Sequence, residues 1–502
     1  MPGFVAWGAL VPLLVALERR ARAGAGARGL FGLGWLFGFV FFLIGMHWIA
    51  LLSEVAITVP WLKYPAWVVA AAYLALYSGL ATLVAGLLAR PTGPRGASAA
   101  GGSGAPAYVP RVALAAAFPL VYLAVEELRA SGEIGFPWFQ PGYTQHAYVP
   151  LIQLASLGSV SAVTLWLLVL NVLLWRSVAG SARLRSALGA LLLVLVPWLW
   201  GQRMLAVAPR ERGPVVALVQ GNVAGEIKWS GRHQGEILRS FLDLSDLAVA
   251  RSPRPVVVIW PETATGSYLR KQLDQAFAVA GFAQRTGVPV FSGFADYAYD
   301  SLGVRRHYNA AGMFAPDGSL GPAYGKRHLV PFGERMPFQR LFPWLGRLEL
   351  GQAEWTPGER PVMFSSAAGP FGCLVCFEAI FPDLSRSDVR AGARWLVNIT
   401  NDEWFGNSAA LYQHAAMAVF RAVENHVPLA RCANTGLTLV ADANGRVVEK
   451  LPVFRPGVMV TPLPVAIPWG FPTPYTRFGD WPGLLSLIGV AALALRAAWR
   501  AR

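Results

Sequence analysis

The 502-residue sequence has few charged residues and very few cysteines. Charged residues make up 14% of the chain and hydrophobic residues 55%, which excludes an ordinary soluble globular protein. Three cysteines, Cys373, Cys376 and Cys432, are too few to predict a disulfide framework. Basic residues outnumber acidic ones by 43 to 28, but we find no nucleic-acid-binding motif, and much of the basic excess lies in short loops between apolar runs. This placement favours a membrane protein over a nucleic-acid-binding protein.

The longest apolar runs lie near the two ends of the sequence, and a bilayer span needs about 20 predominantly apolar residues. We expect seven spans, the first and last of them short: 3–17, 29–52, 64–89, 112–128, 148–175, 186–202 and 481–495. The first run lacks the basic start and the cleavage site of a signal peptide, and a start site that omits one upstream helix is left open. The predicted domains are a membrane domain over 1–202, a globular domain over 203–478, and a C-terminal membrane helix with a cytoplasmic tail over 479–502.

Basic residues gather in alternate loops between the expected spans. Basic loops of membrane proteins lie on the cytoplasmic side, so these loops and the C-terminus are expected in the cytoplasm, with the N-terminus and the globular domain outside. The intervening loops are poor in basic residues, with Lys63 in one and Arg129 in another. The residues that set this orientation are Arg19, Arg20, Arg22, Arg28, Arg90, Arg95, Arg111, Arg176, Arg183, Arg185, Arg496, Arg500 and Arg502.

The globular region alternates short β-rich runs with amphipathic helical stretches, which is typical of a layered α/β domain. Expected strands are 215–220, 256–260, 288–292, 309–314, 372–377, 395–399, 428–432 and 437–441. Expected helices are 233–250, 270–286 and 411–426.

Chemistry-bearing residues follow the strands of this domain. Cys376 lies at the end of an apolar strand, Glu262 follows another strand, and Lys326 lies between them in the sequence. A thiol is largely protonated at neutral pH, so a nucleophilic Cys376 needs a base, for which Glu262 is placed, and a cation such as Lys326 to stabilise the oxyanion. Glu334 is a second carboxylate that would orient Lys326 or relay protons, and the backbone N–H of Phe377 is a second oxyanion donor.

Each of these residues also has a structural explanation when taken alone. Cysteines are often buried in strands, a glutamate after a strand can cap the next helix, and a lysine beside an arginine is usually solvated. Cys373 and Cys376 form a CxxC pair, which raises a redox or metal site as an alternative. Residues three apart on a strand point to opposite faces, and no second Cys/His pair completes a zinc site, so this alternative is disfavoured.

The order of these motifs resembles the Glu-Lys-Cys triad of the nitrilase superfamily. The matching motifs are Trp260-Pro-Glu262, Lys326 with His328-Leu-Val-Pro-Phe-Gly-Glu334, and Cys376-Phe-Glu378. The residues in these motifs are similar to those of the bacterial apolipoprotein N-acyltransferases, a membrane-bound branch of the superfamily. The further matches are Val219-Gln-Gly-Asn222, Lys228-Trp229, Tyr308-Asn309, Asn401-Asp-Glu-Trp-Phe-Gly406, Gln413-His414, Asn434-Thr-Gly436, Gly135-Phe-Pro-Trp138 and Gly142-Tyr143.

The resemblance implies a nitrilase-like αββα sandwich on the periplasmic side of the bacterial inner membrane. Cys376 would take an acyl chain from a phospholipid, such as phosphatidylethanolamine, as a thioester. The α-amine of the diacylglyceryl-cysteine of an apolipoprotein would then accept the chain. Glu262 would act as base and then acid, and Lys326 would stabilise both tetrahedral intermediates. The resemblance implies no metal and no organic cofactor.

Further site residues follow from the same resemblance. Glu334, Phe377 and Glu378 are expected to support the triad, and the expected substrate-binding residues are Trp229, Asn401, Trp404 and Asn434. The two tryptophans are equally compatible with core or interfacial positions, and the two asparagines with turns. The chain departs from the family in two respects. We count seven spans where the family usually has eight, and Phe377 stands where the family often has tyrosine.

Two other functions remain open at this point. A membrane-tethered amidohydrolase would use the same triad and pass the acyl group to water, but one anchor would suffice for it. A transporter or scaffold with an inactive nitrilase-like domain should carry charged residues along a transport path. The runs 29–52 and 64–89 carry no Asp, Glu, Lys or Arg, and all three triad positions are intact.

Overall fold

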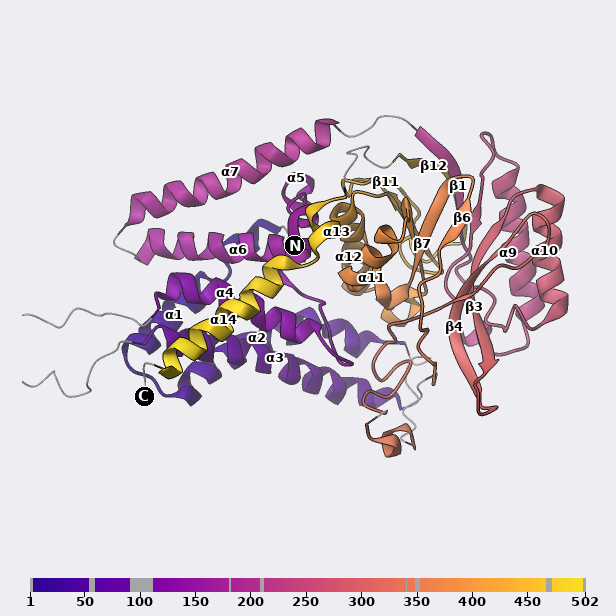
Figure 1. The fold of residues 1–502 in the computed structure, drawn as a ribbon. Helices are drawn as coiled ribbons and strands as arrows, with labels where there is room; N and C mark the ends of the chain where they lie inside the picture. The colour runs from indigo at the N-terminus through magenta and orange to yellow at the C-terminus, as the bar shows by residue number, and fades with distance from the viewer. Residues whose placement is uncertain are drawn as a thin grey trace, which may run out of the picture.

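A computed structural model describes residues 3–53, 59–90, 112–179, 182–207, 212–339, 341–347, 353–465 and 472–499. The expected linker residues Arg95 and Arg111 and the terminal Arg500 and Arg502 lie outside the described residues. The chain forms a helical part and an α/β part, which lie end to end (Figure 1). The last helix returns from the α/β part and runs back along the helical part.

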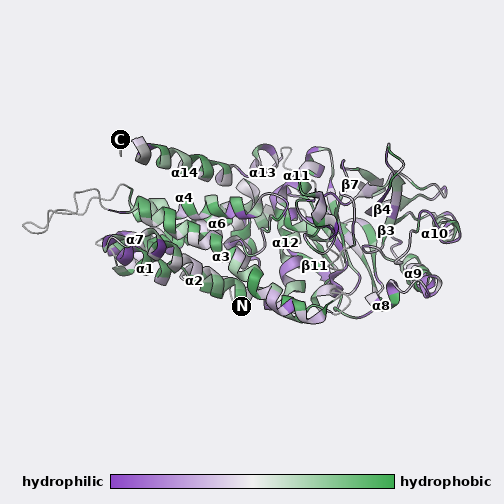
Figure 2. Cartoon of the chain, turned by 90° about the horizontal axis from the view of Figure 1, so that it is seen from below, coloured by the Kyte–Doolittle hydropathy of each residue, from purple (hydrophilic) through white to green (hydrophobic). Residues whose placement is uncertain are grey.

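The helical part contains the apolar runs of the sequence. Its helices are α1 Val11–Arg22, α2 Ala27–Gly45, α3 Lys63–Leu88, α4 Leu114–Ala130, α5 Val149–Ile152, α6 Ala155–Ala179, α7 Arg183–Val207 and α14 Trp481–Trp499. Four segments of the described chain are long and apolar enough to cross a membrane: Ala27–Leu51, Pro60–Leu88, Ala155–Ala179 and Arg183–Ala206. In Figure 2 the helical part is predominantly hydrophobic, whereas hydrophilic and hydrophobic residues mix in the α/β part.

All seven expected spans fall mainly in helices, but three of them lie on apolar helical segments that are short for a bilayer span. Helix α1 begins only at Val11, where Pro12 occupies a first-turn position that suits proline, and it has 12 residues. Helix α4 has 17 residues, and the apolar part of α14 is Trp481–Arg496. By length and composition, only four of the seven expected segments therefore qualify as spans among the described residues. The expected domain boundary at 202/203 falls inside α7.

Small residues bring α2 and α3 into close contact. A methyl group added to Gly34 would lie 2.0 Å from Oγ1 of Thr82, and one added to Gly38 would lie 2.6 Å from Cβ of Ser78. The hydroxyl of Thr82 also donates a hydrogen bond to the backbone oxygen of Leu30 on the facing helix. Glycines four residues apart allow the backbones of apolar helices to approach in this way, so packing rather than charge holds this pair together.

The α/β part contains two six-stranded sheets, in the order β12-β1-β2-β3-β4-β5 and β11-β10-β9-β8-β7-β6. The strands of the first sheet are β1 Arg212–Gln220, β2 Val258–Ile259, β3 Val290–Tyr299, β4 Arg305–Phe314, β5 Tyr324–Gly325 and β12 Gly457–Pro464. The strands of the second are β6 Phe364–Ser366, β7 Gly369–Val375, β8 Trp395–Thr400, β9 Leu429–Ala433, β10 Leu439–Ala441 and β11 Val447–Lys450. The helices are α8 Gly225–Lys228, α9 Gln234–Val249, α10 Leu273–Thr286, α11 Pro382–Arg390, α12 Ala409–Asn425 and α13 Pro474–Phe478.

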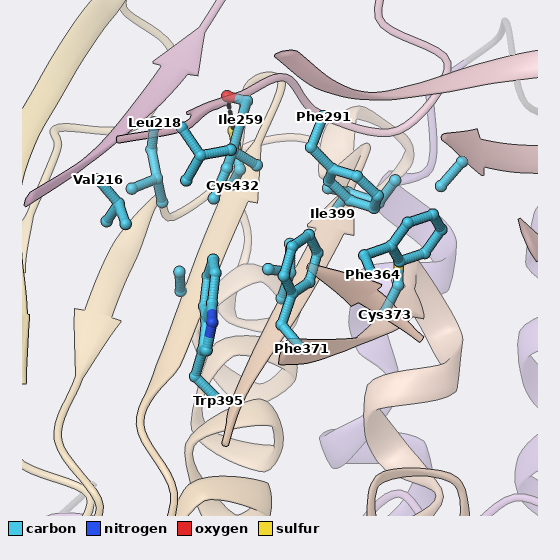
Figure 3. Packing of buried hydrophobic residues seen from close by; sticks show 14 of the residues in the cluster. Val216, Leu218, Ile259, Phe291, Phe364, Phe371, Cys373, Trp395, Ile399 and Cys432 are labelled. Atoms are coloured by element: carbon cyan, nitrogen blue, oxygen red, sulfur yellow. Dashed lines mark hydrogen bonds between the residues drawn. The ribbon is translucent and has the colours of Figure 1, made fainter. Parts of the chain in front are cut away.

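The two sheets pack face to face over a common hydrophobic core (Figure 3). Leu218 and Phe291 of the first sheet meet Phe371 and Trp395 of the second in this core. Helices α9 and α10 cover the outer face of the first sheet, and α11 and α12 pack on the second. The domain is therefore the αββα sandwich that the resemblance implies.

Strand positions agree with expectation better than strand lengths. The expected strand 256–260 is reduced to Val258–Ile259, and the expected strand 372–377 ends at Val375. Strand β7 stops there because Cys376 has a positive φ of 51°, which cannot continue an extended strand. A short 3-10 helix, Cys376–Ile380, begins at that point.

Helix α12 joins the sandwich to the membrane helices. One core cluster contains Trp138 and Ile152 from the helical part together with Phe377 and Phe420 from the α/β part. Buried Glu424 of α12 accepts hydrogen bonds from the hydroxyl of Ser159 and the backbone N–H of Val160, both within α6. These contacts fix one end of the sandwich against the membrane helices.

Candidate active site

Cys376 occupies a sharp turn between strand β7 and the 3-10 helix. Only 8% of the residue is exposed. A non-glycine residue with positive φ is uncommon and persists where its surroundings impose it, as at many functional sites. Burial, together with the nearby Glu262 carboxylate, raises the pKa of the Cys376 thiol, and the positive charge of Lys326 opposes this shift only in part. The resting thiol is therefore protonated at neutral pH and needs a base.

Glu262 follows β2 and is oriented through both of its carboxylate oxygens. Its Oε1 accepts a hydrogen bond from Nδ2 of Asn309 at 2.7 Å, and its Oε2 accepts one from the backbone N–H of Asn401 at 2.8 Å. The residue is 5% exposed. A carboxylate fixed by two donors keeps lone pairs directed into the site, as a general base requires.

Lys326 follows β5 and lies between two carboxylates. Its Nζ is 2.9 Å from Oε1 of Glu334 and 3.5 Å from Oε1 of Glu262. Burial would lower the pKa of Lys326, but Glu334 and Glu262 outweigh burial and raise it. Lys326 is therefore a permanent ammonium ion, suited to stabilising a developing oxyanion rather than to accepting a proton.

Glu334 and Glu378 hold the loops that carry these residues. The second oxygen of Glu334 accepts a hydrogen bond from the backbone N–H of Val330 at 2.8 Å. Glu378 is fully buried and accepts hydrogen bonds from the hydroxyl of Tyr324 and from the backbone N–H groups of Arg327 and Val375. Glu378 thus connects the lysine loop with the turn that bears the thiol.

The expected substrate-binding residues fall into two groups. Trp229 is 42% exposed and Trp404 37% exposed, so both present indole surface outside the core. Asn401 and Asn434 are buried, and their side chains hydrogen-bond to each other at 3.0 Å. Asn434 also pairs with the backbone N–H and C=O of Val223. The asparagines hold the loops around Glu262 together, and a substrate contact for them stays a prediction.

Three further polar residues lie at the site without a role assigned from the sequence. Nδ2 of Asn309 donates to Glu334 as well as to Glu262. Lys228 is fully buried, and its Nζ lies 3.4 Å from the backbone oxygen of Glu262. His414 of α12 lies 3.0 Å from the backbone oxygen of Cys376. Each is a polar residue within a family-like motif, and that was the only signal the sequence offered.

The arrangement can carry out acyl transfer through a covalent thioester. A buried thiol, an oriented carboxylate and a permanent cation supply the nucleophile, the base and the oxyanion stabiliser of that chemistry. Among the described residues, no group of three or more His, Cys, Asp or Glu side chains could hold a metal ion.

The fold and the site define a nitrilase-class domain attached to membrane helices. Residues 215–466 match the carbon-nitrogen hydrolase family, and residues 2–173 match the apolipoprotein N-acyltransferase N-terminal domain. The chain is 36% identical to an apolipoprotein N-acyltransferase of Geobacter metallireducens, over 98% of this chain and 91% of that protein. It is 30% identical to the protein of the same name from Chlorobaculum tepidum, over 99% of this chain and 92% of that protein. The chain therefore belongs to the apolipoprotein N-acyltransferase family.

A solved structure is similar to about half of the chain. An amidase from Nesterenkonia sp. aligns with 20% sequence identity and a TM-score of 0.38, over 51% of this chain and 92% of the amidase.

Proposed function

We propose that this chain transfers an acyl chain from a membrane phospholipid, through a thioester on Cys376, to the N-terminal amine of the diacylglyceryl-cysteine of apolipoproteins. The observation that carries the proposal is the constellation of Glu262, Lys326 and Cys376 in a sandwich packed against membrane helices. Family membership supports the same activity.

The first half-reaction forms the thioester. Glu262 takes the proton of the Cys376 thiol while the sulfur attacks the carbonyl carbon of a phospholipid ester. Lys326 stabilises the oxyanion of the tetrahedral intermediate. The intermediate collapses by breaking the carbon–oxygen bond, and Glu262 returns the proton to the leaving alkoxide. The products are a lysophospholipid and an acyl thioester on Cys376.

The second half-reaction forms the amide. The neutral α-amine of the lipoprotein cysteine attacks the thioester carbonyl, and Glu262 accepts a proton from the attacking nitrogen. Lys326 again stabilises the oxyanion, and collapse releases the sulfur, which recovers its proton from Glu262. The two half-reactions make the enzyme ping-pong, with one covalent intermediate.

Attachment to the membrane helices favours the amine over water as the acceptor. A thioester exposed to bulk water would hydrolyse, which is the reaction of the alternative amidohydrolase. Both proposed substrates are anchored in lipid, so a site held at the membrane surface raises their local concentration and excludes part of the water.

We assign the headgroup of phosphatidylethanolamine to a cavity at the loop that follows Lys326. This cavity of about 430 Å³ lies where the turn after α4 meets the loop that follows Lys326. Arg327 and Arg335 line it with positive charge, and Glu133 supplies a negative charge. A phosphate and an ammonium group in one headgroup match these charges, which supports phosphatidylethanolamine as the donor.

The proposed orientation places the sandwich on the periplasmic side of the inner membrane. The basic residues predicted to lie in the cytoplasm flank helix ends that include those of α3, α6 and α14. Figure 1 shows these three ends at the end of the helical part that lies away from the sheets. Basic residues mark the cytoplasmic side, so the opposite end, with the catalytic domain, faces the periplasm.

Trapping of the acyl-enzyme tests the function directly. Detergent-purified protein is incubated with phosphatidylethanolamine labelled in its acyl chains, in parallel with Cys376→Ser, and both are then treated with neutral hydroxylamine. Hydroxylamine-labile label on the wild type and none on the variant is expected. A folded wild type that gains no label would overturn the donor step. A labelled enzyme that passes its acyl chain to water, but not to a diacylated lipopeptide, would favour the amidohydrolase.

A further inference from the structure

The peptide group between Cys376 and Phe377 has its carbonyl oxygen in contact with a side chain of the protein. The backbone oxygen of Cys376 lies 3.0 Å from Nε2 of His414. The carbonyl of Cys376 and the N–H of Phe377 belong to the same peptide group, and in a trans peptide they point in opposite directions within one plane. A contact that fixes this carbonyl therefore also fixes the direction of the Phe377 N–H.

The hydrogen on His414 can be assigned from its neighbours. A carbonyl oxygen only accepts hydrogen bonds, so Nε2 of His414 must donate to Cys376. On the other side of the ring, Nδ1 lies 3.2 Å from Nη2 of Arg431, which only donates, and 2.9 Å from Oδ1 of Asp402. Either the neutral ring accepts from Arg431 or the charged ring donates to Asp402, and Nε2 carries a hydrogen in both cases. Burial and the positive charge of Arg431 lower the pKa of His414, which favours the neutral ring.

A buried polar network holds the imidazole in place. Asp402 accepts hydrogen bonds from Nη2 of Arg431 at 2.6 Å and from the hydroxyl of Thr400 at 2.9 Å. Arg431 also donates to the side-chain oxygen of Asn398 on the neighbouring strand. All of these side chains are buried. Several hydrogen bonds hold the members of this buried network to one another, so the donor at Nε2 is fixed in position.

The helical part supplies the surface on which this ring rests. The indole of Trp138 stacks on His414 with ring centroids 5.5 Å apart and an interplanar angle of 27°. The Nε1 of Trp138 donates to the side chain of Gln413 at 2.8 Å, and its backbone oxygen accepts from Arg129 at 2.7 Å. Arg129 belongs to α4, so a chain of direct contacts leads from a helix of the membrane part to the nucleophile.

We propose that His414 is a positioning residue that orients the Cys376–Phe377 peptide so that the N–H of Phe377 acts as an oxyanion donor, and that Trp138 holds His414 in that position. This inference rests on the proposed acyl transfer. It assigns His414 to stabilisation of the tetrahedral intermediates, because the imidazole contacts the backbone oxygen of Cys376 and thereby sets the direction of the Phe377 N–H.

Two substitutions of matched reach separate the donor from the packing. His414→Gln places an amide nitrogen as many bonds from the backbone as Nε2, whereas His414→Met has similar reach and no hydrogen to donate. Acylation of each variant is followed in single-turnover experiments, with labelled phosphatidylethanolamine and separately with a p-nitrophenyl ester. The methionine variant is expected to acylate about 10- to 100-fold more slowly with both donors, and the glutamine variant within about fivefold of the wild type.

Alkylation of Cys376 by iodoacetamide distinguishes the positioning role from a merely structural one. A structural defect would slow both alkylation and acylation, whereas loss of the oxyanion donor would slow acylation alone. Alkylation forms no oxyanion, so the methionine variant should alkylate at the wild-type rate while its acylation falls. Equal losses in both reactions would indicate a collapsed site and overturn the proposal, as would wild-type acylation by the methionine variant. Tyr412→Phe, on the exposed side of the same helix, serves as the control expected to behave as wild type.

The link to the membrane part is tested by a double-mutant cycle. Trp138→Leu removes the stacking surface and should slow acylation, but it should add little to His414→Met because both act on the same peptide group. Additive effects would overturn the role of Trp138. If His414→Met does not fold, Trp138→Leu with the alkylation control still tests the coupling. The p-nitrophenyl ester also keeps the test independent of the phospholipid. If neither variant nor wild type uses phosphatidylethanolamine but the ester distinguishes them, the donor proposal fails while the positioning role of His414 stands.

Discussion

The ammonium group of Lys326 lies 2.9 Å from Oε1 of Glu334, closer than its 3.5 Å separation from Oε1 of Glu262. Glu334 is thus the main ion-pair partner of Lys326, and Glu262 remains the carboxylate available for proton transfer. Asn309 donates one hydrogen bond to each carboxylate and keeps them separate. The geometry thus gives the two acidic residues different roles: Glu334 holds Lys326, and Glu262 transfers the proton.

Replacement of Glu334 should therefore weaken oxyanion stabilisation without removing the base. Glu334→Gln keeps an acceptor for the N–H of Val330 and loses the charge that holds Lys326. We expect the rate of thioester formation to fall about 10- to 100-fold, whereas Glu262→Gln should fall further because the proton then has no acceptor. Single-turnover acylation measures both. A Glu334→Gln variant slower than Glu262→Gln would show that Glu334 is the base.

Asn309 should be required for both carboxylates. Asn309→Leu preserves volume but removes the donor that lies 2.7 Å from Glu262 and 3.1 Å from Glu334, so the buried Glu262 and the partly buried Glu334 each lose one hydrogen bond. We expect slower acylation by about 10-fold or more and a lower melting temperature. Asn309→Asp introduces a third negative charge and should be worse. Wild-type kinetics in Asn309→Leu would remove Asn309 from the site.

The sequence predicted the triad because its members follow recognisable apolar strands. Cys376 and Glu262 both follow strands, where side chains of α/β domains meet, although the strand before Cys376 ends two residues earlier than expected. The sequence did not predict the roles of Asn309 and His414. Their partners lie far along the chain, 47 residues away for Asn309 and Glu262 and 38 for His414 and Cys376. Single polar residues inside apolar runs carry no local pattern that names such partners.

The same limit applies to parts of the fold. Strands β1 and β12 pair although most of the domain's sequence separates them. Local periodicity in the sequence does not indicate such a distant partner. The number of spans stays a prediction, because four of the seven expected segments qualify by length and composition among the described residues. The run 3–17 is apolar enough to resemble a span, but helix α1, which begins within it, has 12 residues and packs within the helical core.

Lys228 should make stability rise with pH in the alkaline range. Burial lowers the pKa of Lys228 to about 8, although Glu262 and Glu403 oppose the shift. The unfolded chain binds this proton up to about pH 10.4, so between these values unfolding takes up a proton and the folded state gains stability as pH rises. Below pH 8 the buried charge of Lys228 lowers the free energy of unfolding by about 3 kcal/mol. Melting temperatures at pH 7.5 and 9.5 should rise for the wild type relative to Lys228→Met. Melting temperatures that change equally with pH in the wild type and in Lys228→Met would contradict the lowered pKa of Lys228.

Glu133 should contribute to the choice of phospholipid. Glu133→Gln retains an oxygen that can accept the hydrogen bond from the backbone N–H of Phe338, now formed at 2.7 Å, and removes the charge facing the cavity. We expect the ratio of kcat/KM for phosphatidylethanolamine over phosphatidylglycerol to fall about 5- to 10-fold, since a partly exposed ion pair contributes about 1 kcal/mol. Glu226→Gln, exposed on α8, is the matched control. An unchanged ratio would place the headgroup elsewhere.

The orientation in the membrane should appear in the labelling of single engineered cysteines. The three native cysteines are buried, so they give little background. Ser301→Cys lies in the exposed turn between β3 and β4, and Leu184→Cys lies at the start of α7, where the native side chain is 72% exposed. A maleimide that crosses the outer but not the inner membrane should label position 301 in whole cells and position 184 only after lysis. The reverse pattern would place the catalytic domain in the cytoplasm, away from substrates that present their amines at the outer surface. It would also contradict the orientation inferred from the basic loops.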